Sequence, residues 1–391
     1  MRAWVGQRLS WRLGGYTAVG LAVGGLYLWR LGSLTPGLAP DEAQATAASR
    51  SLEAIWLQPL NAPHKLLQHG LSLISNSAFS WRLASVILAL IFLACFVWLV
   101  RASLGVRAAL FGLLMLGLTP WLVLIGRSAA APIDWLWPLA VTAAALWWWR
   151  TRRWQTLAGY LTFLSLGLAL YVPGLAWFLV IGIIIARRQL AELWRRGGWL
   201  KNSLGLLLLI GVVAPLAKSL VADQVSLSDW LALPRYWPSP LEFIRAVGRA
   251  LTAIAWHTPG NLNWVIDHLA IFSSAQLVLA FIGLASLWLR GRGRYGLYLL
   301  TWVGLAVVLA GLNRDLAVLT VALPVVSGLA AAGLYYLWAE WRRGFPRNPL
   351  ARSLAAGLIG LILVWQFVFA ARYCLVAWPH APATRASYVL Q

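Results

Sequence analysis

Two adjacent carboxylates, Asp41 and Glu42, stand in the stretch GLAPDEAQATAASRSL at residues 37–52. The chain of 391 residues has only 11 acidic residues, so a pair of them calls for a reason. In a partly desolvated cavity a carboxylate has a raised pKa, which makes it a better general base near neutral pH. The alternative is that Asp41, which follows Pro40, caps the helix that begins there. Neighbouring side chains on a helix point about 100° apart, so we expect only one of the two to face a given cavity.

A second charged pair, Arg127 and Asp134, brackets the stretch GRSAAAPIDW at residues 126–135. Apolar runs lie on both sides, so this turn is expected where the chain leaves and re-enters a membrane. An acid at the edge of a membrane helix is costly unless it is paired or lines a wet cavity. Asp134 is therefore either a functional acid or a structural one, as an N-cap or as the ion-pair partner of Arg127.

Three further arginines have the chemistry to hold a phosphate, because the guanidinium group can contact two phosphate oxygens at once. Arg314 lies in a short turn within GLNRDLAVLTVALP, residues 311–324, where the alternative is a charged hairpin tip. Arg245 and Arg249 are four residues apart, which places them on one face of a helix. All three are candidate phosphate ligands.

The histidines and cysteines form no recognisable metal-binding or disulfide pattern. Four histidines, His64, His69, His257 and His268, fall between apolar runs, but their spacing matches no known ligand motif. A divalent metal ion is thus an option without named ligands, and no cofactor is expected. The two cysteines lie inside apolar runs, which argues against a disulfide framework.

The elements that must position these residues are membrane helices. The chain is 61% hydrophobic and only 11% charged, and apolar runs of about 20 residues recur, each long enough to cross a bilayer. We therefore predict an all-α polytopic membrane protein with eleven spans. The spans are 14–32, 82–100, 107–125, 133–149, 155–171, 173–187, 202–221, 269–289, 295–312, 316–337 and 353–373, with Pro173-Gly174 separating the fifth from the sixth.

Basic residues fix the expected orientation. With the N-terminus in the cytoplasm, 20 of the 32 lysine and arginine residues fall in cytoplasmic segments, most of them in short clusters. The first apolar run is expected to stay as a helix, because no convincing signal-peptidase site precedes Asp41. We predict a multi-pass protein of the inner (plasma) membrane, with the C-terminus outside. Because the positive charge follows topology and forms no continuous stripe, a nucleic-acid partner is not expected.

Two long outer loops, 33–81 and 222–268, interrupt this pattern. Each contains an amphipathic stretch, Ala43–Leu57 and Pro240–Trp256, expected to lie in the membrane interface. Nine of the 11 acids lie on or near this outer side, and acids contribute little to topology. The outer face is therefore expected to carry the chemistry. Residues 1–375 are predicted to form one transmembrane domain, followed by a short outer tail, 376–391.

The order of these parts resembles the GT-C superfamily of polyprenyl-phosphate-sugar glycosyltransferases. The closest group is that of the protein O-mannosyltransferases and the lipid A aminoarabinose transferases. The resemblance is carried by the Asp-Glu pair in 37–52, by AFSWRLASVILALI at 78–91, by residues 104–150 with their Arg and Asp, and by the stretch 314–324. It covers about the first 190 residues well and the rest mainly by topology.

The resemblance implies an inverting transfer of sugar from a polyprenyl-phosphate donor to an acceptor hydroxyl at the outer face. It assigns Asp41 as the base and Glu42 as a supporting acid, and Asp134 as the second acid, which would orient the acceptor or hold a metal.

For phosphate, the resemblance makes Arg127 and Arg314 candidates for a clamp, with Arg245 and Arg249 as further donor contacts. The acceptor would be a protein, a lipid or a glycan of the cell envelope.

The sequence departs from the family pattern in two ways, and the second favours a rival reading that the presence of Asp41 and Asp134 disfavours. The prolines of LQPLNAPHKLLQHG are separated where the family often has a Pro-Pro-rich stretch, and a folded outer domain after the last span is not expected here. The rival is a non-catalytic GT-C-like membrane subunit or a binder of lipid-linked intermediates. A transporter is a third reading, although transporters place functional charge near the midplane and in repeated halves.

Overall fold

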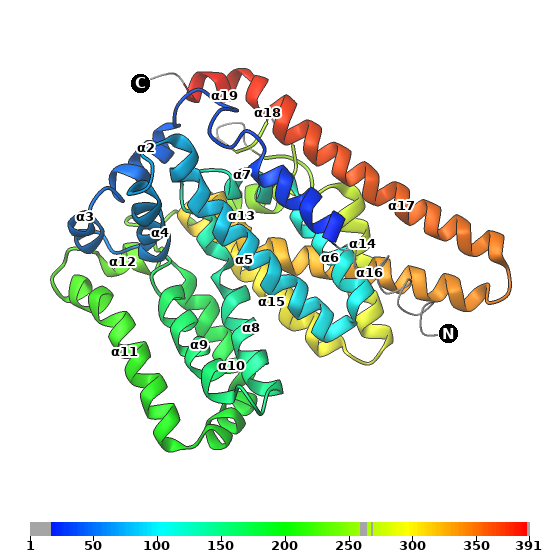
Figure 1. The fold of residues 1–391 in the computed structure, drawn as a ribbon, viewed down its shortest axis with the longest axis horizontal. Helices are drawn as coiled ribbons and strands as arrows, with labels where there is room; N and C mark the ends of the chain where they lie inside the picture. The colour runs from blue at the N-terminus through cyan, green and yellow to red at the C-terminus, as the bar shows by residue number, and fades with distance from the viewer. Residues whose placement is uncertain (1–16, 259–263, 267–268, 389–391) are drawn as a thin grey trace.

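The computed structural model describes residues 17–258, 264–266 and 269–388, and every regular element in these residues is a helix (Figure 1). This composition confirms the all-α class. His268 and the first residues of the predicted span 14–32 lie outside the described residues.

Five helical segments are long and apolar enough to cross a membrane, and a sixth qualifies if one bent pair counts as a single span. The five are Ala78–Leu104, Trp199–Val221, Gly293–Asn313, Leu316–Gly344 and Pro349–His380. Each of the other predicted spans also coincides with helical residues where the structure describes them. Eleven crossings stay a prediction.

The bent pair covers the predicted span 107–125 and adds a break that the prediction did not include. Helices α6 (Val106–Gly117) and α7 (Pro120–Gly126) meet at 68°. Pro120 has no N–H group for an intrahelical bond, and it disfavours helical geometry in the residue before it. Thr119 is accordingly extended, and the chain turns there.

The remaining long elements follow the predicted order. They are α5 (Ala78–Leu104), α8 (Trp137–Arg150), α9 (Gln155–Ala169), α10 (Leu175–Gly197), α11 (Trp199–Val221), α14 (Ser274–Leu289), α15 (Gly293–Asn313), α16 (Leu323–Gly344) and α17 (Pro349–Arg372). The break between α9 and α10 falls at the expected Pro-Gly, where Gly174 has a φ of +75°, in the left-handed region that favours glycine.

The first long loop folds into three short helices, α2 (Pro40–Ala47), α3 (Leu52–Leu57) and α4 (Ala62–Ser72). The prediction of one helix over Ala43–Leu57 is therefore wrong. The chain breaks because Ser51 is extended and its hydroxyl accepts the N–H of Ala54, which starts a new helix.

The second long loop contains α12 (Leu227–Trp230) and α13 (Pro240–Ala255), which agrees with the predicted amphipathic helix. Ser239 and Glu242 form a capping box at the start of α13. One face packs on the protein, and apolar side chains such as Leu241 and Ile244 are exposed on the other.

Two short 3₁₀ helices, η1 (Pro132–Leu136) and η2 (Leu316–Ala322), pack against each other in the core. Close by, α14 and α16 cross so tightly that a Cβ atom on Gly283 would lie 1.9 Å from the Leu329 carbonyl oxygen. The contacts with η2 and α5 hold η1, which carries Asp134.

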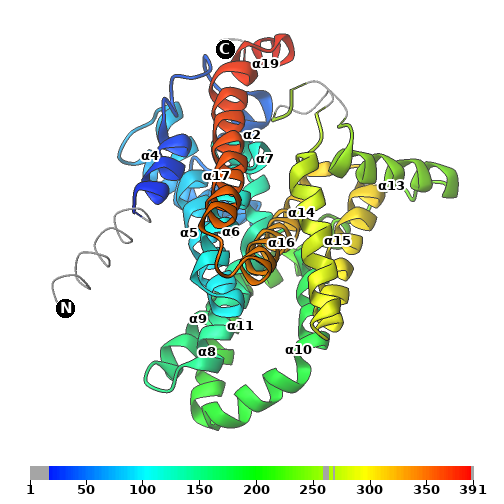
Figure 2. The ribbon, with the colours of Figure 1, turned by 90° about the vertical axis from the view of Figure 1, so that its right-hand side faces the viewer.

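The short helices α2, α4, α7, α13 and α19 (Pro382–Ser387) gather at one end of the molecule, called the site end below (Figure 2). The turns that join α8 to α9 and α10 to α11 lie at the opposite end, with basic residues such as Arg152 and Arg195 near them. The last residues of the chain return to the site end through a π-helical turn, η3 (Tyr373–Ala377), and α18 (Trp378–His380).

Candidate functional site

Glu42, the second acid of the opening pair, is 1% exposed and accepts four hydrogen bonds. Two come from the Arg82 guanidinium, from Nε at 3.2 Å and from Nη2 at 2.8 Å. The other two come from the backbone N–H groups of Ala39 at 3.1 Å and Ala129 at 2.8 Å. A buried carboxylate is tolerated when it is both paired and hydrogen-bonded. Glu42 therefore has a structural role.

Asp41 has a different environment. It is half-buried in the first turn of α2, whose N-cap is Ala39, so Asp41 is not the N-cap. Glu42 closes the cap by accepting the N–H of Ala39. The charge of Asp41 acts on Tyr388, which places this carboxylate beside the last helix. The structure thus separates the pair as expected, with one acid buried and one at a partly open surface.

Asp134 lies in η1 and is completely buried. Neither carboxylate oxygen has a hydrogen-bond partner in the described part of the chain, and the same holds for the indole nitrogen of Trp137, which approaches it. The predicted ion pair with Arg127 does not form in this structure. Buried polar atoms without partners are costly, so Asp134 is suited to a group that the chain itself does not supply.

Lys65, in α4, is the basic residue whose charge acts on Asp134. Its ammonium group is half-buried and donates to the Gln58 carbonyl oxygen at 2.6 Å. Burial lowers the pKa of Lys65 to about 8, although the Asp134 charge opposes this shift. Lys65 therefore changes its charge at about pH 8. In the sequence it stands between Asp41 and Asp134.

The orientation of α4 is set by two buried polar side chains on the same helix. Gln68 donates to the Ala129 carbonyl oxygen at 2.6 Å and accepts from Ser49 at 2.8 Å. His64 bonds to Ser85 at 2.7 Å. Burial lowers the pKa of His64 to about 3, so this ring stays neutral and Lys65 supplies the positive charge at this position.

Arg127 binds backbone carbonyl oxygens instead of Asp134. Its guanidinium donates to the carbonyl oxygens of Leu26 at 2.6 Å, Tyr27 at 3.1 Å and Trp29 at 2.8 Å. These carbonyls belong to the end of the first described helix, Thr17–Leu28, where the helix dipole favours a cation. Arg127 thus attaches the segment after α7 to the end of the first described helix. Its contact with a phosphate stays a prediction.

The other candidate arginines lie on α13 and beside it, away from α2 and α4 (Figure 2). Arg314 adopts the left-handed conformation with φ +56° and pairs with Glu242 at 3.2 Å, both about half exposed. Hydrogen bonds from Ser239, with the Arg314 charge, lower the pKa of Glu242. Arg245 and Arg249 are exposed on α13. The structure therefore places the predicted acids, Asp41 and Asp134, apart from the three arginines on and beside α13.

A cavity of about 360 Å³ lies at the site end, between α7, α13, α14 and α17. Aromatic rings make up much of its wall, from Trp121, Trp256, Trp264, Phe272, Phe369 and Tyr373. Trp121 belongs to α7, and a short segment, 127–131, joins α7 to η1, which carries Asp134. Its lining suits an apolar chain.

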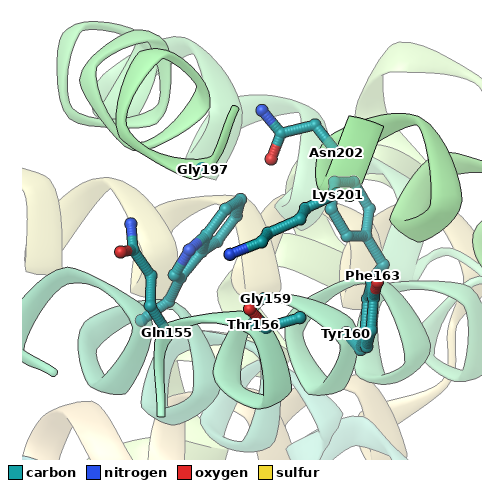
Figure 3. Close-up of a pocket in the computed structure, with 9 residues that line it drawn as sticks. Gln155, Thr156, Gly159, Tyr160, Phe163, Gly197, Lys201 and Asn202 are labelled. Carbon is teal, nitrogen blue, oxygen red and sulfur yellow. The ribbon is translucent and has the colours of Figure 1, made fainter. Parts of the chain in front are cut away.

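A smaller pocket at the opposite end contains none of the predicted site residues. It is lined by polar groups such as Gln155, Tyr160 and Asn202, and the Lys201 amine reaches into it (Figure 3). In the described residues, no group of three or more His, Cys, Asp or Glu side chains is placed to hold a metal ion.

Sequence reasoning missed three residues of this site, Lys65, Arg82 and Tyr388. For Lys65 one signal existed, because the chain has only three lysines among its 32 basic residues, the other two being Lys201 and Lys218. Nothing local marks Arg82 or Tyr388, whose partners are distant in sequence.

Comparison with protein-family models gives no match, and comparison with curated proteins gives none either. Solved structures do match. The chain superposes on ArnT from Cupriavidus metallidurans in the apo state with a TM-score of 0.59 and 16% identity, covering 96% of this chain and 77% of ArnT. For ArnT bound to undecaprenyl phosphate the TM-score is 0.58, with 15% identity and coverage of 95% and 77%.

The archaeal oligosaccharyltransferase AglB from Archaeoglobus fulgidus, solved with an inhibitory peptide and a dolichol-phosphate, also matches. The TM-score is 0.55 with 14% identity, and the match covers 93% of this chain but only 56% of AglB. ArnT, a lipid A aminoarabinose transferase, and AglB are both members of the GT-C superfamily. At such low identity these likenesses concern the fold, and they confirm the resemblance seen in the sequence motifs.

Proposed function

We propose that this chain, which has the GT-C fold, transfers a sugar from a polyprenyl-phosphate donor to an acceptor hydroxyl. The observation that carries the proposal is the contrast between the two neighbouring acids at the site end. Glu42 is buried and held by four hydrogen bonds, whereas Asp41 is partly exposed. Lys65 and the buried Asp134 form a second charged pair. The solved relatives were captured with polyprenyl-type phosphates, which supports this donor class.

The proposed reaction is a single displacement at the anomeric carbon. The acceptor oxygen attacks this carbon, the bond from the carbon to the phosphate oxygen breaks, and the sugar inverts. Asp41 takes the hydroxyl proton as general base. Polyprenyl phosphate leaves with an added negative charge, which the Lys65 ammonium is placed to stabilise. Asp134 orients the acceptor, and the aromatic cavity accommodates part of the donor's apolar chain.

We further propose that the site end faces outside the cytoplasmic membrane. The basic turns at the opposite end, around Arg152 and Arg195, would then lie in the cytoplasm as the positive-inside rule requires. A donor anchored by its lipid can present its sugar at this face. The acceptor would be a protein, lipid or glycan of the envelope.

A transfer assay tests this function. Purified protein in nanodiscs is incubated with polyprenyl-phosphate sugars and a panel of envelope acceptors, and the release of polyprenyl phosphate is measured. Turnover that depends on both substrates supports the proposal. Tight donor binding with no turnover on any acceptor would instead support the non-catalytic binder.

Replacing Asp134 by asparagine should lower kcat by about 100-fold, the cost of a misplaced acceptor, without lowering the thermal midpoint, because the carboxylate oxygens make no hydrogen bond in the described residues. The measurement is the rate of polyprenyl phosphate release beside a thermal unfolding scan. Asp229→Asn, on an exposed ion pair with Arg235, is the matched control and should keep wild-type turnover. Full activity of Asp134→Asn would remove this residue from the site.

Donor affinity should fall as the pH rises through about 8, because Lys65 is charged below its pKa and neutral above it. Between about pH 7 and about pH 9 the protonated fraction falls nearly tenfold, and affinity for polyprenyl phosphate should follow it. Native mass spectrometry in nanodiscs measures the binding. Lys65→Gln should bind weakly and show no such slope, whereas the exposed Lys218→Gln should behave as wild type. An unchanged slope in Lys65→Gln would assign the titration to another group.

A further inference from the structure

The segment Tyr373–Tyr388 ends with the ring of Tyr388 against Arg82, the partner of Glu42. We infer that Tyr388 is a positioning residue, which stabilises the Arg82–Glu42 pair and thereby fixes the first turn of α2 and the direction of the Asp41 carboxylate. The inference rests on the proposed function, since it concerns the geometry of the proposed base.

Tyr388 is almost completely buried, at 3% exposure, although it lies at the end of the described chain. Its ring covers the Arg82 guanidinium, with Cζ 5.6 Å from the ring centroid. A cation over an aromatic face is attracted by the ring's negative face, more strongly when both are shielded from water. On its other side the ring packs edge-to-face with Trp378, at 5.5 Å and 80°.

Tyr388 is linked to Asp41 through Arg82 and Glu42, by the cation–π contact and then by hydrogen bonds to the residue next to Asp41. Arg82 holds Glu42 through two bonds and also donates to the carbonyl oxygens of Leu31 at 3.2 Å and Gly37 at 2.9 Å. These carbonyls lie in the chain that leads into α2. Arg82 therefore fixes α2 from both sides of its N-terminus, and Tyr388 limits how far the guanidinium can move.

The first part of the same segment is fastened independently. The hydroxyl of Tyr373 accepts the backbone N–H of Ile266 at 2.9 Å, and Tyr373 also lines the aromatic cavity. The segment thus runs from the proposed lipid cavity to the proposed base. The charged groups that act on Tyr388 are Glu42, Arg82 and Asp41, and of these Arg82 lies against its ring.

The test uses Tyr388→Leu, which removes the ring, and Tyr388→Phe, which keeps it, in the full-length protein. Arg385→Gln is the control, because Arg385 is exposed on α19, the helix that ends just before Tyr388. Tyr388→Leu should lower kcat about tenfold, of the order expected from losing a shielded cation–π contact, with the KM for donor within about twofold of wild type. Tyr388→Phe and Arg385→Gln should retain wild-type kcat.

Hydrogen exchange supplies a readout that needs no activity. In Tyr388→Leu the amides of residues 39–43 should exchange faster, while those of α16 keep their protection. Unchanged kcat and exchange in Tyr388→Leu would overturn the inference, and so would a general loss of protection that includes α16. Local exchange as expected in a protein that transfers no sugar would show that the contact holds α2 while the proposed function fails.

Discussion

Asp41→Asn should lower the rate of sugar transfer by about two to four orders of magnitude, the range that a general base contributes. The amide has nearly the shape of the carboxylate but cannot accept the acceptor proton. The fold should persist, because the buried bonds of the neighbouring acid belong to Glu42. The measurement is single-turnover release of polyprenyl phosphate by purified protein, together with donor binding, which should change little.

The matched control for this variant is Asp223→Asn. Asp223 is exposed and has a φ of +52°, a conformation that asparagine adopts readily, so the substitution is structurally mild. It should transfer at the wild-type rate. If Asp41→Asn transfers as fast as this control, Asp41 is not the base.

Arg82→Met should destabilise the fold by about 3–5 kcal/mol, because Glu42 is then left as an uncompensated buried charge. Four elements meet at this pair: the segment before α2, α2 itself, α5 and the loop after α7. The free energy of unfolding in mild detergent, measured by denaturant titration, checks the value.

Two further variants distinguish the cost of burying an unpaired charge from the loss of an ion pair. Arg343→Met breaks an exposed pair with Glu340 and should cost no more than about 1 kcal/mol. In the double variant Arg82→Met with Glu42→Leu, part of the stability should return, since no charge stays buried. A loss for Arg82→Met as small as that for Arg343→Met would show that the Arg82–Glu42 pair does not hold the site end.

The parts of the fold that depend on local chemistry could be predicted from the sequence. Apolar run length located the helices, Pro173-Gly174 located the break before α10, and the amphipathic stretch Pro240–Trp256 located α13. The bend at Pro120 was missed because a proline inside an apolar run is compatible with both a kinked span and a broken one, and packing decides between them.

The site was predicted less completely for a similar reason. The separation of Asp41 from Glu42 follows from helix geometry, and the structure shows it. Which acid is buried depends on Arg82, 40 residues further along the chain, and on Tyr388, beyond any local pattern. Arg127 was expected near Asp134, but helix-end carbonyls without partners attract its guanidinium instead.

The most direct test of the central claim is an experimental density map of the protein in nanodiscs with added polyprenyl phosphate. The account predicts the phosphate at the site end, within hydrogen-bonding distance of the Lys65 ammonium, with the Asp41 carboxylate facing the same space and the apolar chain in the aromatic cavity. Phosphate density at the opposite end, beside Gln155 and Lys201, or an Asp41 side chain closed off from the bound phosphate, would contradict it.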